Sequence, residues 1–361
     1  MNTLRSVCFA VCCPIGAAAL VLLAGCSGNT DSEAAATVPP PTGHYEGPIS
    51  YQGAELRVAL ELREISPGKL QAEVSFPQLP GLEFEAARTS YQAPQLRLEQ
   101  LAAQQGGITV QAVREGDFLR GVLRWDSLQA DFVWVRRGEA AARGFREQVF
   151  AVPGTGFRRL RLLLPDDTLP QHPALVLLAP PPTVAAAGSR AVYLARRGFV
   201  TVVVPVAAAS DSATAQTTAA VLATVRRQVG VDSSRVGYWG RGPATVLVAA
   251  AAGQLPQPGF VVLEGASAAT RAEAQLYQVL SQQRIPTLSL YASLDTTVQV
   301  QASARRLRTA LGYRKGTQVR IIPQATADFL QPGRTRSDGQ WQWPQPAAGY
   351  WPGLTEWLGQ R

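Results

Sequence analysis

The hydrophobic pattern of the chain changes partway along its length. Over residues 44–137 apolar and polar positions alternate, as in Leu56, Val58, Leu60 and Leu62, and turn signals such as Ser66-Pro67-Gly68 separate the runs. Alternation with period two is typical of strands that bury one face. The region therefore predicts a small antiparallel all-β domain, a barrel or sandwich of roughly seven or eight short strands.

After a link at 138–144, near-continuous apolar runs alternate with segments of helical character. A hairpin is predicted over 150–164. Strands are then predicted at 174–178, 200–204, 236–239, 260–263, 287–291 and 319–322, and helices at 189–197, 213–228, 243–252, 269–282, 302–311 and 350–358. This order predicts an α/β domain over 145–361, with a mostly parallel sheet covered by helices on both faces.

The N-terminal segment has the pattern of a signal peptide. An apolar run over 7–23 is too short and too interrupted for a spanning helix. It ends in Leu23-Ala24-Gly25-Cys26, which resembles a bacterial lipobox. That resemblance implies removal of 1–25, lipidation of Cys26 and a tether over 26–43. We expect a membrane-anchored protein of the cell envelope, on the outer membrane or facing the periplasm in a host with two membranes; an ordinary cleavage site is the alternative.

The composition restricts which ligands and partners the protein can bind. All four cysteines lie in the first 26 residues, so the rest of the chain can form no disulfide or thiolate metal site. We see no cluster with metal-ligand spacing and no cofactor motif, and expect neither metal nor cofactor. The net charge of +8 is carried almost entirely by arginines, which are scattered along the chain and include five Arg-Arg pairs. This distribution favours solvated helix ends over a nucleic-acid interface, while an anionic membrane surface remains a reasonable partner.

Four stretches of the second domain resemble sequence motifs of a known protein family. They are AVYLARRGF at 191–199, VDSSRVGYWG at 231–240, IPTLSLYASLD at 285–295 and IIPQATA at 321–327. The domain resembles the α/β-hydrolase superfamily, and with the preceding β domain it is similar to bacterial carboxylesterases that have an N-terminal β module. The resemblance implies an ester or acyl hydrolase with a serine nucleophile, a histidine base, an acid and two oxyanion donors.

The positions matched to that machinery lack most of it. The nucleophile position in Gly240-Arg241-Gly242-Pro243-Ala244 is Gly242, and Pro243 has no N–H to offer an oxyanion. The loop at 179–182 contains three prolines and predicts a poor second donor. The histidine position is Ala327, and only Asp295 matches the family, as a remnant of the acid.

Two features could substitute for the missing groups. The chain has two histidines, His44 at the start of the β domain and His172 at the amino edge of the sheet, and we interpret both as surface or loop residues. Ser267, in Gly265-Ala266-Ser267-Ala268-Ala269, mimics an elbow one strand later. We favour a role for it as the cap of the helix beginning near Ala269, with a relocated nucleophile as the alternative.

Aromatic residues also gather near the C-terminus: Trp341, Trp343, Tyr350, Trp351 and Trp357. We expect them to close a hydrophobic core, and a patch for sugars or lipids is the alternative.

Three functions follow from these observations. The first is an envelope lipoprotein whose hydrolase-like domain is a non-catalytic pseudoenzyme that binds a small ligand or an envelope protein. The second is an active hydrolase with rearranged catalytic residues, centred on Ser267 and Asp295. The third is a binding module formed by the β domain, with the α/β domain as its scaffold. Enzymatic activity is thus left open, with inactivity favoured.

Overall fold

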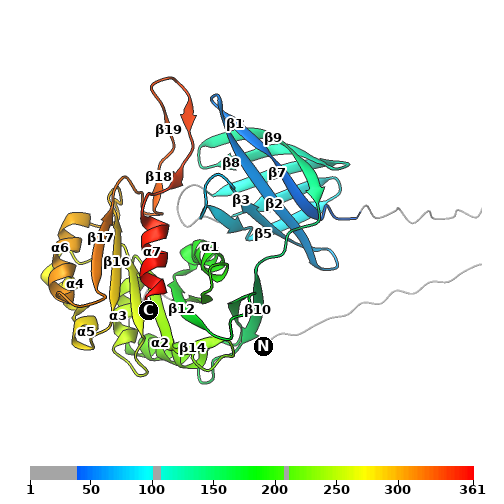
Figure 1. The fold of residues 1–361 in the computed structure, drawn as a ribbon. Coiled ribbons are helices and arrows are strands. Elements are labelled where there is room, and N and C mark those ends of the chain that lie inside the picture. The colour runs from blue at the N-terminus through cyan, green and yellow to red at the C-terminus, as the bar shows by residue number, and fades with distance from the viewer. Residues whose placement is uncertain (1–38, 101–106, 207–210) are drawn as a thin grey trace, which may run out of the picture. The chain divides into compact units, whose positions relative to one another are not determined.

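The computed structural model describes residues 39–100, 107–206 and 211–361 (Figure 1). The predicted signal peptide, the lipidation site Cys26 and nearly all of the tether lie outside these residues. Where the chain is described, no helix has both the length and the apolar character needed to cross a bilayer.

A curved antiparallel sheet of nine strands forms first, in the order β4-β3-β2-β1-β9-β8-β7-β6-β5. Its strands are β1 Gly43–Tyr51, β2 Ala54–Ser66, β3 Lys69–Ser75, β4 Glu83–Glu85, β5 Arg88–Gln92, β6 Gln95–Glu99, β7 Ile108–Glu115, β8 Phe118–Trp125 and β9 Leu128–Gly138. The sheet curls until β3 packs against β5. The predicted antiparallel region is therefore present, with more strands than expected.

Alternate side chains of these strands fill the inside of the curved sheet. Tyr45, Leu60 and Trp134 are fully buried in one hydrophobic cluster. The curvature brings neighbouring backbones close together, because a Cβ on Gly121 would lie 1.9 Å from the carbonyl oxygen of Gln111. Glycine is the residue that permits such an approach.

A mixed sheet of eight strands follows, in the order β10-β11-β13-β12-β14-β15-β16-β17. Its strands are β10 Phe145–Phe150, β11 Leu160–Pro165, β12 His172–Ala179, β13 Val200–Pro205, β14 Val231–Arg241, β15 Phe260–Glu264, β16 Thr287–Ala292 and β17 Gln318–Ile322. Pairs from β12 onward are parallel, and β10 and β11 are antiparallel. The prediction of a mostly parallel sheet is confirmed.

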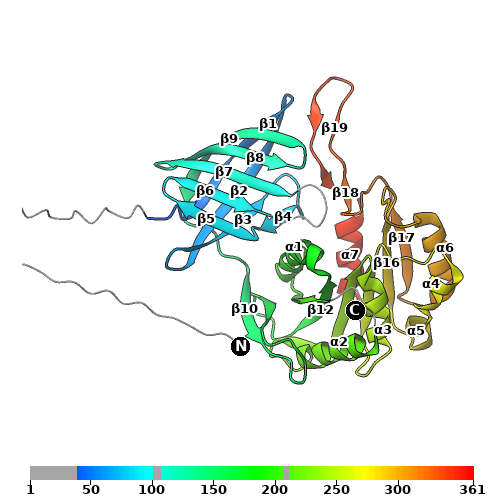
Figure 2. The ribbon, with the colours of Figure 1, turned by 180° about the vertical axis from the view of Figure 1, so that it is seen from behind.

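Helices cover both faces of this sheet (Figures 1 and 2). They are α1 Val184–Ala195, α2 Ser212–Val225, α3 Ala244–Ala252, α4 Arg271–Gln275, α5 Gln278–Gln282, α6 Val300–Leu311 and α7 Tyr350–Gly359. Along β12, Leu175 and Leu177 join the core under α1 and α7, while Val176 joins the core under α2, α3 and α6. Burial on both faces explains why the strands read as continuous apolar runs.

Two of the predicted helices differ from the structure. The helix expected over 269–282 is two short helices, α4 and α5, separated by Leu276 and Tyr277. The helix expected from 189 begins at Val184, directly after a single 3-10 turn over Pro181–Thr183. Alanines in 185–187 carry helix propensity but no amphipathic pattern, so the periodicity missed this first turn.

Between β17 and α7 the chain forms two short ladders, β18 (Leu330–Gln331) with β21 (Gln345–Pro346), and β19 (Arg334–Thr335) with β20 (Trp341–Gln342). Trp343 from this segment is buried in the core of the curved sheet, 6.4 Å from the Trp125 ring. Tyr350, Trp351 and Trp357 are buried in the core of the mixed sheet. The prediction that these aromatics close hydrophobic cores is confirmed.

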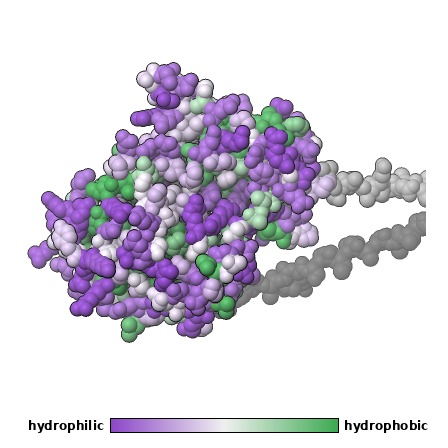
Figure 3. Space-filling model, in the orientation of Figure 1, coloured by the Kyte–Doolittle hydropathy of each residue, from purple (hydrophilic) through white to green (hydrophobic). Residues whose placement is uncertain are grey.

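The visible face carries no large apolar patch. In Figure 3 hydrophilic residues cover most of it, and hydrophobic ones appear only in small separate groups. Scattered apolar residues of this kind are normal for a protein surface.

Candidate functional site

The most distinctive backbone feature of the mixed sheet is the sharp turn after its central strand. β14 ends at Arg241, Gly242 has a φ of +52°, and α3 begins at Ala244. The Gly242 N–H donates to the carbonyl oxygen of Glu264 at the end of the adjacent strand, at 2.8 Å. A Cβ built on Gly242 would meet no heavy atom within 4 Å. The turn thus has left-handed backbone and open space, and glycine supplies no reactive group there.

The groups that could donate to an oxyanion near this turn are already engaged or absent. Pro243 follows Gly242 and has no N–H. In the loop after β12, the first N–H beyond Ala179 belongs to Thr183, and it donates to the carbonyl oxygen of Pro180 at 2.8 Å. The loop therefore closes on itself, and no backbone N–H of residues 180–183 is left to donate to an oxyanion.

Arg241 occupies the space beside the turn on the side where the histidine was expected. Its guanidinium donates to Asp328 Oδ1 at 2.7 Å and to the carbonyl oxygen of Ala327. Desolvation acts to raise the pKa of Asp328, but the guanidinium groups of Arg241 and Arg190 outweigh it and hold that pKa below its ordinary value. A carboxylate held in this way is a weak proton acceptor.

Below this ion pair lies a buried polar cluster from three elements: Arg190 of α1, Glu264 of β15 and Tyr350 of α7. The Tyr350 hydroxyl donates to Glu264 Oε1 at 2.5 Å, and Arg190 Nε donates to the Tyr350 oxygen at 3.3 Å. Arg190 Nε also lies 3.6 Å from Glu264 Oε2, which accepts no hydrogen bond from the described residues. Burial and the neighbouring Glu264 raise the pKa of the Tyr350 phenol, which therefore stays protonated.

The sequence analysis did not identify this cluster. One signal for it is present, because Glu264 is a charged residue directly after the apolar run Phe260–Leu263, and a charge at a buried strand end requires a partner. Its partners Arg190 and Tyr350 come from segments 74 residues before it (264 − 190) and 86 residues after it (350 − 264), and no local pattern links them.

A cavity of about 20 Å³ adjoins the cluster and is lined in part by Arg190, Trp239, Arg241 and Glu264. Space of this size holds about one water molecule, whereas pockets for small-molecule ligands measure roughly 300–1,000 Å³. Glu264 Oε2 and the two guanidinium groups are suitable partners for that water. The cavity is too small for an ester substrate.

Asp295, which follows β16, is used in a local turn. Its Oδ1 accepts from Thr297 N at 2.8 Å and from Thr297 Oγ1 at 2.6 Å. Its Oδ2 lies 3.4 Å from the position of a Cβ on Gly265. No histidine accompanies it, so its geometry is that of an Asx turn.

Both histidines lie in strands and not in loops, and the expectation of a surface or loop position is wrong for His172, whereas His44 is partly exposed. His172 is the first residue of β12, at the amino edge as expected, but it is only 4% exposed. Its Nδ1 lies 3.2 Å from the Gly198 carbonyl oxygen and its Nε2 lies 3.3 Å from Asp167 Oδ1. His44 belongs to β1 and contacts Glu61 at 2.7 Å. Neither is positioned to serve the turn at Gly242, which lies at the carboxyl edge.

Ser267 is exposed, and it is not the helix cap that we expected. The cap of α4 is Thr270, whose hydroxyl accepts from the Glu273 N–H at 3.2 Å while Glu273 Oε2 accepts from the Thr270 N–H at 2.8 Å. Ser267 donates to Glu273 Oε1 at 3.1 Å. The Thr270 N–H holds the pKa of Glu273 below its ordinary value, so this carboxylate is a poor base for activating the serine.

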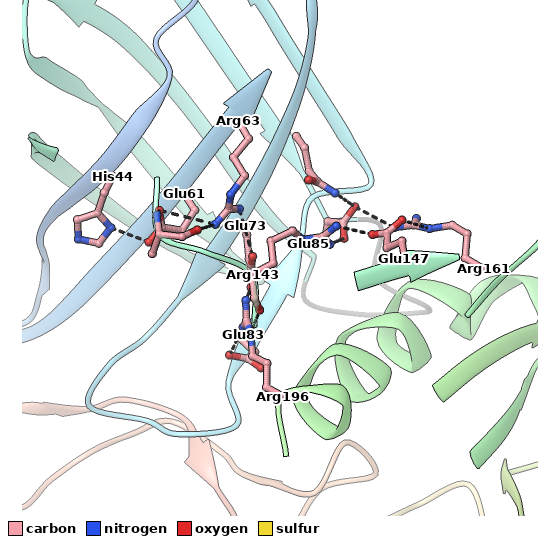
Figure 4. Close-up of polar contacts among 12 residues, drawn as sticks. His44, Glu61, Arg63, Glu73, Glu83, Glu85, Arg143, Glu147, Arg161 and Arg196 are labelled. Atoms are coloured by element: carbon pink, nitrogen blue, oxygen red, sulfur yellow. Dashed lines mark hydrogen bonds and ion pairs between the residues drawn. The ribbon is translucent and has the colours of Figure 1, made fainter. Parts of the chain in front are cut away.

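A larger cleft of about 1,040 Å³ lies beside the curved sheet, lined by residues of β3, β5 and β6 and by Arg143, Glu147 and Arg161. Arg143 lies 2.9 Å from Glu85, and Arg161 lies 2.6 Å from Glu147, so these charges neutralise one another (Figure 4). The sequence analysis missed the cleft, because its residues come from distant strands that share no motif.

Two further cations line the same cleft. Lys69 and Arg88 have no ion-pair partner within the described part of the chain, and both are exposed. They are the charges of the cleft that remain available to a ligand. Groups of three or more potential metal ligands are absent from the residues that the structure describes.

Neither a protein-family model nor a curated protein sequence matches this chain. Solved structures give weak similarities. One is a puromycin-hydrolyzing peptidase from Mycobacterium tuberculosis, 13% identical with a TM-score of 0.43 over 78% of this chain, which spans half the length of that peptidase. Another is a hypothetical protein from Pseudomonas aeruginosa, 12% identical with a TM-score of 0.42, covering 60% of this chain and 93% of that one.

A third is a candidate dienelactone hydrolase from Klebsiella pneumoniae, 16% identical with a TM-score of 0.41, covering 60% of this chain and 99% of that one. Two of the three similar proteins are named as hydrolases. Similarities at this level do not indicate what this chain does. Its function has to be inferred from the residues of the site.

Proposed function

We propose that the mixed-sheet region has an α/β-hydrolase fold and that the protein is a non-catalytic member of that group, carried on a lipid anchor in the cell envelope. The proposal for the fold is supported by the strand, left-handed turn and helix at β14, Gly242 and α3. This is the local structure on which such folds present their nucleophile. The position of Asp295 in the loop after β16, where the family resemblance implies the acid, supports the same proposal.

The proposal of inactivity depends on one observation. The residue with left-handed backbone at the turn is Gly242, which faces open space and has no side chain, so no nucleophilic atom is present to attack a carbonyl. The oxyanion donors are missing as well, since Thr183 donates within its own loop and Pro243 has no N–H. Loss of a single such donor costs about 3–4 kcal/mol of transition-state stabilisation. Restoring a serine alone would therefore restore little activity.

Covalent labelling tests this proposal. A soluble form that begins after Cys26 is treated with a fluorophosphonate probe, which reacts with activated serines. We expect no labelling of the parent or of a Gly242→Ser variant, since neither has a histidine near the turn. Labelling of the parent that disappears in Ser267→Ala would contradict the proposal and establish the relocated nucleophile instead.

A second candidate function is favoured by the cleft beside the curved sheet. At about 1,040 Å³ it is much larger than the cavity under the turn, and most of its lining comes from the curved sheet. We propose that this region binds a polar ligand through anionic groups that pair with Lys69 and Arg88, while the mixed sheet acts as its scaffold.

The cleft is tested with citrate as a carboxylate probe and tripolyphosphate as a phosphate probe. A ligand that binds only the folded state raises the melting temperature by mass action. We expect the shift to disappear in a Lys69→Gln, Arg88→Gln variant and to persist in the control Arg57→Gln, Arg137→Gln. An equal shift in both double variants would refute binding at the cleft.

A further inference from the structure

The edge of the mixed sheet formed by α6 and β17 carries an uncompensated positive charge. Between Asp295 and Asp328 the chain has no acidic residue, over 32 positions (residues 296–327). Five cations on this edge are exposed: Arg305, Arg306 and Arg308 on α6, and Arg314 and Lys315 in the loop before β17. We call these five residues, with Tyr313, the basic face.

Among the residues that the structure describes, no carboxylate pairs with the basic face. None of its five cations forms an ion pair within the described residues, and Arg308 donates only to the carbonyl oxygen of Val319, at 3.1 Å. The two flanking acids are used elsewhere, since Asp295 accepts from Thr297 and Asp328 pairs with Arg241. Elsewhere in the protein, arginines such as Arg143, Arg161 and Arg196 pair with glutamates. The basic face is therefore a concentrated positive charge that is available to an anionic partner.

Tyr313 lies in the middle of this charge and is the most exposed large hydrophobic residue of the described chain, at 104% of its reference area. It follows Gly312, where α6 ends, and precedes Arg314 and Lys315. Tyrosine beside lysine and arginine is the combination that anchors proteins at the headgroup level of a bilayer, where the ring is buried and the hydroxyl stays hydrated. Protection of the edge strand against aggregation explains the cations but not the tyrosine.

We propose that the basic face docks on the surface of a membrane rich in anionic phospholipid. The identity of this occupant rests on the proposed lipoprotein function, because a chain lipidated at Cys26 is held beside a bilayer. The 16 residues between Cys26 and Gly43 (27–42) span at most about 3.3–3.6 Å each, which gives the folded part a reach of roughly 50–60 Å. Docking through the basic face would add a second point of attachment to the bilayer.

The strength of membrane binding can be worked out from the number of charges. A cation next to an anionic leaflet contributes about 1 kcal/mol, which corresponds to roughly fivefold in affinity. Neutralising Arg305, Arg306, Arg314 and Lys315 should therefore weaken binding by up to roughly 600-fold, which is four fivefold factors multiplied. Arg308 is left in place because its hydrogen bond to Val319 contributes to the fold.

The experiment is flotation of the soluble form, without its lipid, with vesicles of phosphatidylcholine alone or with added phosphatidylglycerol. We expect binding only to the phosphatidylglycerol vesicles, loss of that binding at high salt, and its loss in the fourfold glutamine variant. The matched control neutralises four exposed arginines that also lack ion pairs: Arg57, Arg137, Arg158 and Arg159. It should bind like the parent. Tyr313→Ser should weaken binding several-fold at each salt concentration at which the parent binds.

Equal vesicle binding by the fourfold variant and the control would overturn the proposal, and so would equal binding to vesicles without phosphatidylglycerol. A duplex DNA that binds the basic face more tightly than the vesicles at the same salt would assign it to nucleic acid instead. The anchor is tested separately by metabolic labelling of Cys26 with radioactive palmitate. An unlabelled Cys26 with intact vesicle binding refutes the lipoprotein, whereas a labelled Cys26 with no vesicle binding refutes the basic face.

Discussion

The turn at Gly242 allows a quantitative prediction. Replacing Gly242 and replacing Gly240, two residues before it, should both destabilise the protein, but for different physical reasons. Gly242 has a φ of +52° and open space around its missing Cβ. A Cβ on Gly240 would lie 2.6 Å from Val248 Cγ2 and 2.9 Å from the carbonyl oxygen of Ala244. A side chain at Gly242 is disfavoured by the backbone conformation, and a side chain at Gly240 is disfavoured by packing.

For Gly242→Ala, a left-handed conformation costs an L-residue roughly 1–2 kcal/mol, and the stiffer unfolded chain returns about 0.4–1 kcal/mol. The net loss of unfolding free energy should be about 1 kcal/mol. Gly240→Ala forces a methyl group into occupied space, which costs roughly 1–3 kcal/mol. The two costs overlap in size, so a second variant is needed to separate them.

Val248→Ala supplies that separation, because it removes the atom nearest to the new methyl group at Gly240. In urea unfolding, Gly240→Ala and Val248→Ala should compensate each other by about 0.5–3 kcal/mol, while Gly242→Ala and Val248→Ala should add within about 0.5 kcal/mol. Strong coupling between Gly242→Ala and Val248→Ala, or a loss above roughly 3 kcal/mol for Gly242→Ala alone, would refute the open, left-handed turn.

Three further predictions concern other parts of the fold. Tyr350→Phe removes the hydrogen bond to Glu264 and should lower the unfolding free energy by roughly 1–3 kcal/mol, read from urea unfolding, because it leaves a buried carboxylate under-satisfied. Thr270→Ala should cost about 1 kcal/mol in the same assay, and Ser267→Ala close to nothing, since Thr270 is the cap of α4. Desolvation acts to lower the pKa of His44, but Glu46 and Glu61 outweigh it and raise that pKa above 6.5. Its stabilising contribution is therefore complete below pH 6.5 and disappears as the pH rises through the raised pKa, so urea unfolding at a series of pH values should show a decline that His44→Gln abolishes.

The hydrophobic pattern was sufficient to predict most of the mixed sheet. Its central strands are buried on both faces, so runs such as Val200–Val204 and Phe260–Leu263 read as strands without tertiary information. The pattern failed where side-chain hydrogen bonds decide the outcome. The capping box of Thr270 and Glu273 starts a short helix that a periodicity cannot separate from the one after it.

The candidate site was less accessible to sequence reasoning than the fold. The absence of a serine at Gly242 and of a histidine at Ala327 could be read from local motifs. The cluster of Arg190, Glu264 and Tyr350 joins three distant segments, and the self-closed loop at Thr183 depends on a single backbone hydrogen bond. The cluster is a consequence of tertiary structure that no local pattern contains, whereas the Thr183 hydrogen bond spans three residues and depends on the backbone conformation of the loop.

The most direct test of the central claim is the rate at which the purified soluble form hydrolyses a short-chain aryl ester. If Gly242 and the engaged donors leave the turn without catalytic groups, the rate should equal that of buffer plus an unrelated protein, and Asp295→Asn should leave it unchanged. Saturable hydrolysis well above that background, lowered by Asp295→Asn or Ser267→Ala, would contradict the claim.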